Sequence, residues 1–367
     1  GGCVEKPFER KETVRWSYLM IRARSEKLFL ATLLWKELEM RVLVSGRISE
    51  DVIFRLKEEH TVEVHGEDRP MERQKLLDSI CEKEGLLCMI SDRIDTELLE
   101  KAGCLRMIAN YAVGYDNIDL QAATARGLPV SNTPGVLTDS VADLTFALIL
   151  ATARRVGEGD KRNREGQFQV WAPLLFLGSE VSGKTLGIVG LGNIGRAVAR
   201  RARGFNMRIL YYNRRRLEKS EELSLGVEYL DIKTLLAESD FVSLHVPLTK
   251  QTRHLVGRKE LEKMKRTGYL INASRGPVVH EEALVTALRE GWIAGAGLDV
   301  YENEPSLASG LKELENAVLL PHLGSATQET RFRMASKAAE NLLSGLKGKK
   351  PPTCLNWEDL SRSRSRS

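Results

Sequence analysis

The 367-residue sequence lacks several features that would assign it to particular classes of protein. Its longest uncharged apolar stretches, residues 28–35 and 144–153, are well short of the roughly twenty residues that a membrane span needs. It has no evident secretory signal and no repeat of solenoid period, and its five cysteines include no C-x-x-C pair. We therefore expect a soluble, cytoplasmic protein with reduced thiols, no metal site and no membrane partner.

The sequence also lacks a strong excess of charge of one sign, because the net charge is only +5 and the extra basic residues are spread along the chain. This pattern gives no reason to expect a nucleic-acid partner. The exception is a short Arg–Ser repeat at 361–367, whose low complexity predicts that 357–367 form a disordered tail. Residues 1–39 mix basic and acidic residues, could hold one amphipathic helix over 21–39, and directly precede Met40. We expect 1–39 to be a non-native or disordered extension.

Short apolar strands alternate with helical patterns after Met40, which predicts an α/β fold. Strands are expected at 41–45, 61–65, 86–90, 105–109, 128–131, 186–190, 207–212, 240–245, 268–273, 295–299 and 317–320. Helices are expected at 49–59, 72–84, 95–102, 117–126, 139–155 and 328–346, whereas 157–182 lack clear periodicity. We predict two domains: a flavodoxin-like substrate domain formed by 40–138 with 322–356, and a doubly wound Rossmann dinucleotide-binding domain formed by 139–321.

The helix predicted at 139–155 is apolar nearly all round. Such a helix must be buried, and we expect it to lie between domains or subunits. Ser140 and Asp143 have the spacing of a capping box at its start.

A glycine-rich turn stands at the start of the second group of strands. The apolar run 186–189 is followed by Gly190-Leu191-Gly192-Asn193-Ile194-Gly195, by a helical pattern, and by a second strand at 207–212. In this order the glycines allow a tight turn, close approach of the backbone to a pyrophosphate, and packing of the helix on the strand. The helix N-terminus offers free N–H groups to the phosphates. A glycine turn of an unrelated α/β fold is the alternative, but the full context predicts a dinucleotide site.

The end of the second strand of this group bears on the choice of cofactor. An NAD site usually places Asp or Glu there, to bind the ribose 2′-hydroxyl. Here Asn213 is followed by Arg214, Arg215 and Arg216, and a guanidinium binds phosphate through two parallel hydrogen bonds. We predict a preference for NADP(H), with NAD(H) as the second candidate. The alternative is that the arginines form a solvated basic turn.

Three more polar segments follow predicted strands of the same group, where ligands bind α/β sheets. Residues 270–276 contain Arg275, residues 297–305 contain Glu304, and residues 319–327 contain His322. Together with the glycine turn and the motifs at 110–119 and 132–138, they resemble the D-isomer-specific 2-hydroxyacid dehydrogenase family, most closely its glyoxylate/hydroxypyruvate reductases. The resemblance covers about residues 40–356.

The resemblance implies an NAD(P)H-dependent reduction of a small 2-keto acid, glyoxylate or hydroxypyruvate, to the D-2-hydroxy acid. It implies a catalytic set of Arg275, Glu304 and His322. Arg275 would hold the substrate carboxylate and polarise its carbonyl, and His322 would give a proton to the alkoxide. Glu304 would bond His322, orient it and favour its protonated form.

The resemblance also implies the other contacts of the site. The backbone N–H groups of Val113 and Gly114 would bind the carboxylate, and Ser325 would lie beside His322. The remaining implied cofactor contacts are those of His245, Pro247, Ala273, Ser274, Asp299 and Gly324. A homodimer built on the 139–155 helix is implied as well, with Trp171 reaching into the partner's pocket.

Two alternatives stay open at the level of the sequence. Dehydrogenases of 2-ketogluconate, D-lactate and phosphite share the catalytic set, so the set does not identify the substrate. A protein of a different class, a non-enzymatic nucleotide-sensing scaffold like the co-repressors of this fold, would suit the Arg–Ser tail. The intact catalytic set argues against a scaffold.

Overall fold

The computed structural model describes residues 39–364, so the predicted extension lies outside the described residues except for Glu39. Contacts within the chain divide it into two units. Unit 2 comprises Asn110–Asp119 and Ser131–Ala338, and unit 1 comprises the remaining described residues. The predicted limits of a substrate domain and a dinucleotide-binding domain stay a prediction.

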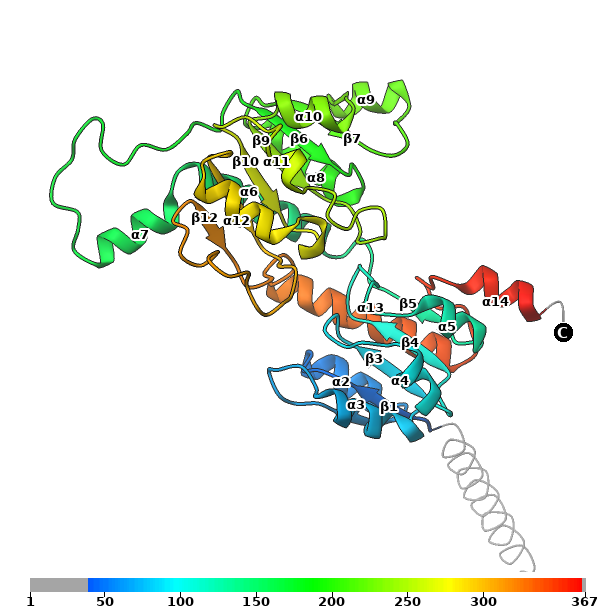
Figure 1. The fold of residues 1–367 in the computed structure, drawn as a ribbon. Coiled ribbons are helices and arrows are strands. Elements are labelled where there is room, and N and C mark those ends of the chain that lie inside the picture. The colour runs from blue at the N-terminus through cyan, green and yellow to red at the C-terminus, as the bar shows by residue number, and fades with distance from the viewer. Residues whose placement is uncertain (1–38, 365–367) are drawn as a thin grey trace, which may run out of the picture. The chain divides into compact units, whose positions relative to one another are not determined.

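Unit 1 is built on a five-stranded sheet with the order β2-β1-β3-β4-β5 (Figure 1). Strand β1 pairs in parallel with both β2 and β3. The strands are β1 (Arg41–Val44), β2 (Thr61–Val64), β3 (Gly85–Cys88), β4 (Met107–Asn110) and β5 (Val130–Ser131). The helices are α2 (Glu50–Lys57), α3 (Arg73–Ser79), the 3-10 helix η1 (Ile80–Glu82), α4 (Thr96–Lys101), α5 (Leu120–Ala125), the second part of α13 (Gln328–Leu346) and α14 (Trp357–Arg364).

Unit 2 is built on a seven-stranded sheet with the order β12-β11-β10-β9-β6-β7-β8, in which every pairing is parallel. The strands are β6 (Thr185–Val189), β7 (Arg208–Tyr212), β8 (Glu228–Tyr229), β9 (Phe241–Leu244), β10 (Tyr269–Asn272), β11 (Gly295–Leu298) and β12 (Ala317–Leu319). The helices are α6 (Thr138–Ala153), α7 (Val156–Arg164), α8 (Asn193–Arg203), α9 (Lys219–Leu225), α10 (Ile232–Glu238), α11 (Arg258–Leu261), the 3-10 helix η2 (Gly276–Val278), α12 (Glu281–Arg289) and the first part of α13.

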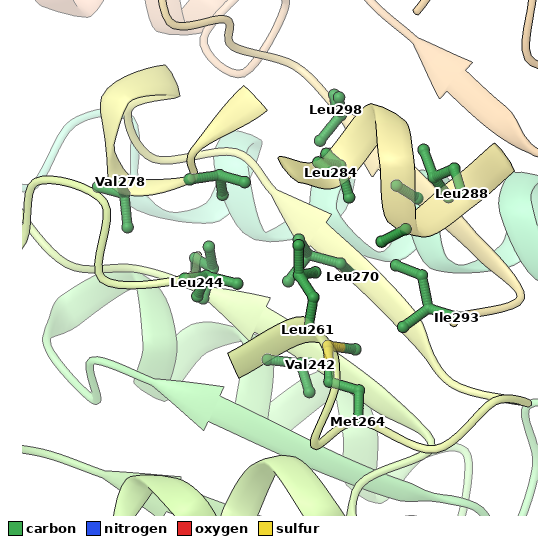
Figure 2. Close-up of a cluster of buried hydrophobic side chains, with 14 of the residues drawn as sticks. Val242, Leu244, Leu261, Met264, Leu270, Val278, Leu284, Leu288, Ile293 and Leu298 are labelled. Atoms are coloured by element: carbon green, nitrogen blue, oxygen red, sulfur yellow. The ribbon is translucent and has the colours of Figure 1, made fainter. Parts of the chain in front are cut away.

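Side chains of the unit 2 strands alternate between two hydrophobic layers, as expected for a parallel sheet that is covered on both faces. Leu186 and Ile188 of β6 pack into the layer that α6 and α8 cover, whereas Val189 packs into the opposite layer. Figure 2 shows that opposite layer, where Leu284 of α12 lies among the same buried cluster as Leu270 of β10. The two layers fix the strands, and the strands in turn fix the loops that follow their carboxyl ends.

The predicted α/β alternation is confirmed, and each predicted strand lies within two residues of an observed one. Several elements differ from the prediction. The two-residue edge strand β8 is too short to produce a pattern, and α7 forms within 157–182, where no periodicity was expected. The helix predicted at 72–84 is divided, because its last turn tightens into η1.

Helix α6 differs from the prediction at its start and in its surroundings. It begins at Thr138, and its N-cap Leu137 makes no side-chain cap, so the predicted capping box is wrong. The Ser140 hydroxyl instead donates to the Gly324 carbonyl at 2.8 Å, and Asp143 pairs with Arg201. The helix packs on α8, β10, β11 and β12 of its own unit. Its apolar surface is therefore buried inside unit 2 and supplies no separate argument for a second subunit.

The predicted disordered tail is wrong over 357–364, which form α14, and residues 365–367 lie outside the described residues. Asn356, which is 1% exposed, anchors the start of this helix. Its Oδ1 accepts from the Val130 N–H, and its Nδ2 donates to Leu128 O and Thr124 Oγ1, each at 2.9 Å. The low-complexity pattern gave no sign of this anchor, because the asparagine precedes the repeat.

Candidate active site

The glycine turn and the segments with Arg275, Glu304 and His322 all follow carboxyl ends of the parallel strands of the seven-stranded sheet, whereas the loop at 113–114 follows β4. Strands β7 and β8 extend the sheet on one side of β6, whereas β9 to β12 extend it on the other. The chain therefore changes direction between β6 and β9, and such a switch point is where open α/β sheets bind ligands.

The glycine turn after β6 has the geometry of a pyrophosphate cradle. Gly190 has φ +100°, and a Cβ atom there would lie 2.6 Å from His245 O, so only glycine fits. Gly195 packs against Gly190 in the same way, with 2.3 Å from its would-be Cβ to Gly190 O. A Cβ on Gly192 would meet nothing within 4 Å, and no side chain caps α8 at this residue. The space and the uncapped helix N-terminus fit a bound diphosphate.

Asn213 and the arginines after β7 have separate roles. The Asn213 Oδ1 accepts from the Leu191 N–H at 2.7 Å, so this side chain holds the glycine turn. Arg214 and Arg215 have exposed side chains. Arg216 does not join them as predicted, because its Nε and Nη2 bind Glu222 at 2.8 and 2.9 Å. One of the three predicted guanidiniums is thus paired with a carboxylate.

The predicted residues after β9 and β10 line the same edge of the sheet. His245 follows β9, and burial lowers its pKa to about 4, so its ring is neutral. Its Nε2 is 2.8 Å from Ser243 Oγ, and its buried Nδ1 has no hydrogen-bond partner within the described part of the chain. Pro247 is exposed two residues later, and Ala273 and Ser274 are half-buried after β10.

Arg275 follows β10 and is held as a fixed cation. Its Nε donates to Asp116 Oδ1 at 2.9 Å, and its Nη1 donates to Ser274 O at 2.8 Å. Its Nη2 lies where a side chain on residue 114 would begin, 1.7 Å from the would-be Cβ of Gly114. The Asn272 side chain fixes the turn, because its Nδ2 donates to Arg275 O at 3.0 Å. The structure therefore brings Arg275 and Gly114 together.

Val113 and Gly114 belong to a loop whose carbonyls are held by two asparagines. The Asn110 Nδ2 donates to Gly114 O at 2.8 Å, and the Asn132 Nδ2 donates to Val113 O at 2.8 Å. These bonds fix the peptide planes of the loop. The backbone of the loop is therefore already oriented before an anion binds to it.

Glu304 and His322 form a hydrogen-bonded pair, with 2.9 Å between His322 Nδ1 and Glu304 Oε2. Each side chain is 36% exposed, so the pair is open to a ligand. Burial alone would raise the pKa of Glu304, but the hydrogen bond and charge of His322 and the Tyr301 N–H lower it below the ordinary value. His322 has φ +56°, a left-handed conformation that is uncommon outside glycine and concentrates at functional sites.

Asp299 fixes the segment that carries His322. Its two carboxylate oxygens accept the Leu323 N–H at 2.6 Å and the Gly324 N–H at 2.8 Å, and its carbonyl accepts the His322 N–H at 3.0 Å. Burial raises the pKa of Asp299, and the two N–H donors oppose this rise. Ser325, 9% exposed, follows in the same buried turn.

Sequence reasoning did not assign a role to Asp116 or Asn272. Asp116 lies inside the motif at 110–119, close to Gly114. An acidic residue in such a glycine-containing turn could have indicated a partner for Arg275. Asn272 occupies the last position of β10, where a polar residue in an apolar strand signals a turn anchor.

Other kinds of site are missing from the described residues. Residues 39–364 contain no group of three His, Cys, Asp or Glu side chains that could hold a metal ion. Over the same range the cysteines are free thiols, and none of the helices is both long and apolar enough to cross a bilayer.

The chain that carries the glycine turn, the anchored Arg275 and the Glu304–His322 pair is similar to known proteins. Residues 146–324 match the family model for the NAD-binding domain of D-isomer-specific 2-hydroxyacid dehydrogenases. The glyoxylate reductase of Thermococcus litoralis is 51% identical over 327 residues, which are 88% of this chain and 98% of that protein. The chain belongs to the D-isomer-specific 2-hydroxyacid dehydrogenase family.

Solved structures of members of this family have the same fold. A glyoxylate reductase from Paecilomyes thermophila has a TM-score of 0.78 and 35% identity, covering 87% of this chain and 99% of that one. An NADPH-dependent glyoxylate/hydroxypyruvate reductase from Sinorhizobium meliloti, in complex with NADP and malonate, has a TM-score of 0.76 and 34% identity, covering 86% and 97%. The predicted family and fold class are thereby confirmed. This 2-hydroxyacid dehydrogenase is an oxidoreductase that uses a nicotinamide dinucleotide and acts on a small keto or hydroxy acid.

Proposed function

We propose that this chain reduces glyoxylate or hydroxypyruvate to the D-2-hydroxy acid, with NADPH as the preferred reductant. The observation that carries the proposal is the 2.9 Å Glu304–His322 pair in the same unit as the anchored Arg275. Relatives named glyoxylate reductase, 51% identical over nearly their whole length, support the choice of substrate.

Arg275 and the loop at 113–114 bind and orient the substrate carboxylate. Asp116 and Ser274 O hold two of the guanidinium nitrogens, so the Nη2 N–H groups remain for a ligand. A guanidinium fixed in this way holds a carboxylate without losing side-chain entropy when the ligand binds. The backbone N–H groups of Val113 and Gly114 would add further donors, since Gly114 lies directly against the Arg275 guanidinium.

His322 supplies the proton. Its Nδ1 is engaged by Glu304, so its Nε2 is the nitrogen that donates to the substrate oxygen as that oxygen becomes an alkoxide. The ionised Glu304 orients the ring and stabilises the imidazolium before transfer. A reduced dinucleotide would supply the hydride from its nicotinamide; Gly190 to Gly195 would hold its diphosphate, and Asp299 and Gly324 would be further cofactor contacts.

The preference for NADPH rests on the residues after β7. The position where an NAD site usually carries an acid holds Asn213, whose Oδ1 accepts from the Leu191 N–H, and the next two residues, Arg214 and Arg215, are exposed. We infer that these two arginines bind the 2′-phosphate.

We also infer that the enzyme is a homodimer. The segment 165–178, which follows α7, exposes apolar side chains that water does not favour. They are Phe168, Val170, Trp171, Leu174, Leu175 and Leu177, of which Leu174 is 85% exposed and Trp171 77%. Light scattering should give a dimer for the wild type and a monomer for the double variant Trp171→Ser/Leu174→Ser; a wild-type monomer would contradict the inference.

Free thiols at the described cysteines are in keeping with a cytoplasmic location.

Initial rates of NADPH and NADH oxidation with glyoxylate, hydroxypyruvate, pyruvate and 2-ketogluconate test the proposal. We expect NADPH with glyoxylate or hydroxypyruvate to give the highest kcat/KM. The double variant Arg214→Ala/Arg215→Ala should raise the KM for NADPH about tenfold to a hundredfold, because charged hydrogen bonds are lost. NADH, which has no 2′-phosphate, is the internal control, and its KM should hardly change. Failure to oxidise NADPH with any keto acid would instead favour a nucleotide-sensing scaffold.

A further inference from the structure

A cluster of five titratable side chains outside the catalytic set contacts the loop that carries Glu304. The loop follows β11, and its residue Glu302 exchanges two hydrogen bonds with Glu281, the first residue of α12. The Glu302 N–H donates to Glu281 Oε2 at 2.7 Å, and the Glu281 N–H donates to Glu302 Oε2 at 3.2 Å. The other Glu281 oxygen accepts the Ala308 N–H at 2.9 Å. Glu281 is 5% exposed, so a buried carboxylate holds both ends of the loop.

Two carboxylates that each accept the backbone N–H of the other residue require a positive or hydrogen-bonding partner. His254 supplies it, since its Nε2 is 2.5 Å from Glu302 Oε1. Arg253 lies farther off, at 3.7 Å from the same oxygen, and the His280 ring packs edge-on against the His254 ring at 4.6 Å. Burial opposes ionisation of Glu302, but the bonds from His254 and the Glu281 N–H outweigh it and lower the pKa of Glu302.

The backbone of His254 is held in a left-handed conformation, with φ +53°, which a residue with a Cβ adopts only when its surroundings force it. The surroundings are the turn after Arg275. The His254 N–H donates to Pro277 O at 2.8 Å, and the Val256 N–H donates to Val278 O at 3.1 Å. The main chain of His254 is thus tied to the Arg275 turn, while its side chain is tied to the Glu304 loop.

These two attachments place His254 between the two catalytic loops. Gly276 brings the same loops into direct contact, because a Cβ there would lie 1.8 Å from the carbonyl of Tyr301. Tyr301 in turn holds Glu304, since its N–H donates to Glu304 Oε1 at 3.0 Å. A shift of Glu302 would therefore move Glu304 relative to His322.

We propose that His254 is a positioning residue for proton transfer: through Glu302 it sets the loop that places the Glu304 carboxylate on His322 Nδ1. The proposal rests on the proposed function of Glu304 and His322. It assigns to His254 no contact with substrate or cofactor. His254 acts through the loop, so its loss should affect the proton-transfer step and leave cofactor binding intact.

The test compares His254→Ala, His254→Gln and Arg253→Ala as full-length enzymes. With NADPH and glyoxylate, His254→Ala should lower kcat about tenfold to a hundredfold at an unchanged KM for NADPH, because a small misplacement of a catalytic group is costly. The basic limb of its pH–rate profile should move to lower pH, since Glu304 then stabilises the imidazolium less well. His254→Gln, whose amide can still donate to Glu302, should recover most of the rate. Arg253→Ala, which removes a cation that makes no hydrogen bond to Glu302, should behave as the wild type.

A second readout separates this proposal from the proposed function. The low-field proton resonance of the His322 Nδ1–H, identified by its disappearance in Glu304→Gln, should be lost or broadened in His254→Ala and restored in His254→Gln. If the wild type reduces keto acids but His254→Ala keeps the wild-type kcat, pH limb and resonance, the positioning role is wrong and the function stands. If the wild type reduces no keto acid, the function is wrong, and the resonance alone decides whether His254 orders the pair.

Discussion

Replacing Gly276 with alanine should disable the enzyme with a modest effect on its fold. The new Cβ atom would lie 1.8 Å from both the C and the O atom of Tyr301 and 2.5 Å from the Glu302 nitrogen. Non-bonded carbon atoms prefer about 3.5 Å or more, so the loop would have to retreat by about 1.7 Å or more. The neighbour is backbone, which cannot rotate away as a side chain can.

The magnitude comes from Glu304, the member of the catalytic pair that this loop carries. A retreat of about 1.7 Å would open the 2.9 Å His322–Glu304 contact beyond the range of a hydrogen bond. Misplacement of this size costs about a hundredfold in kcat, and overpacking costs about 1–3 kcal/mol of unfolding free energy.

The assay is steady-state reduction of glyoxylate with NADPH, together with urea unfolding of the same preparation. Gly103→Ala is the matched control, because a Cβ there meets nothing within 4 Å, and it should keep both rate and stability. A Gly276→Ala enzyme with wild-type kcat and stability would refute the claim that close contact of the two loops sets the catalytic geometry.

Three named contacts outside this loop also lead to testable expectations. Asp116→Asn should raise the KM for glyoxylate about fivefold, equivalent to about 1 kcal/mol, because the Arg275 Nε loses its charged partner; an unchanged or lower KM measured at saturating NADPH would contradict this. The hydrogen bond from Arg216, with a smaller one from Tyr211, outweighs burial and lowers the pKa of Glu222 from 4.5 to about 2. The ionised carboxylate therefore stabilises the fold fully above about pH 4.5. This contribution is lost as the pH falls toward 2. Glu222→Gln should therefore flatten the acid side of the stability curve in urea unfolding, and a curve as steep as that of the wild type would argue against the assignment. Asn356→Ala should cost about 2–4 kcal/mol of unfolding free energy, because the buried Val130 N–H and Leu128 carbonyl lose their partners, and a loss below about 1 kcal/mol would show that the anchor of α14 matters little.

The sequence predicts most of the fold because unit 2 repeats one physical pattern. Its inner strands are buried on both faces and read as short apolar runs, and several are followed by a turn whose glycine or polar residue carries a specific constraint. Gly190 is an example, since its position before a helix indicates a turn that tolerates no side chain. The same logic places Arg275, Glu304 and His322 at one edge of the sheet from the order of strands and turns alone.

The remaining features depend on contacts between residues that are distant in sequence. The pairing of Asp116 with Arg275 spans 159 positions, and the anchoring of α14 by Asn356 spans more than 220. Nothing local distinguishes Arg216, which is bound to a buried glutamate, from Arg214, which is exposed. The left-handed backbone of His322 is equally invisible in the sequence, because histidine is not a residue that signals it.

The most direct test of the proposed reduction is the rate of NADPH oxidation in the presence and absence of glyoxylate, measured for the wild type and for His322→Gln. We predict that the wild type oxidises NADPH only when the keto acid is present. His322→Gln should bind NADPH as well as the wild type does and lose about a hundredfold or more in kcat, because the proton donor is gone. A wild type that reduces no keto acid, or a His322→Gln enzyme that turns over as fast as the wild type, would contradict the central claim.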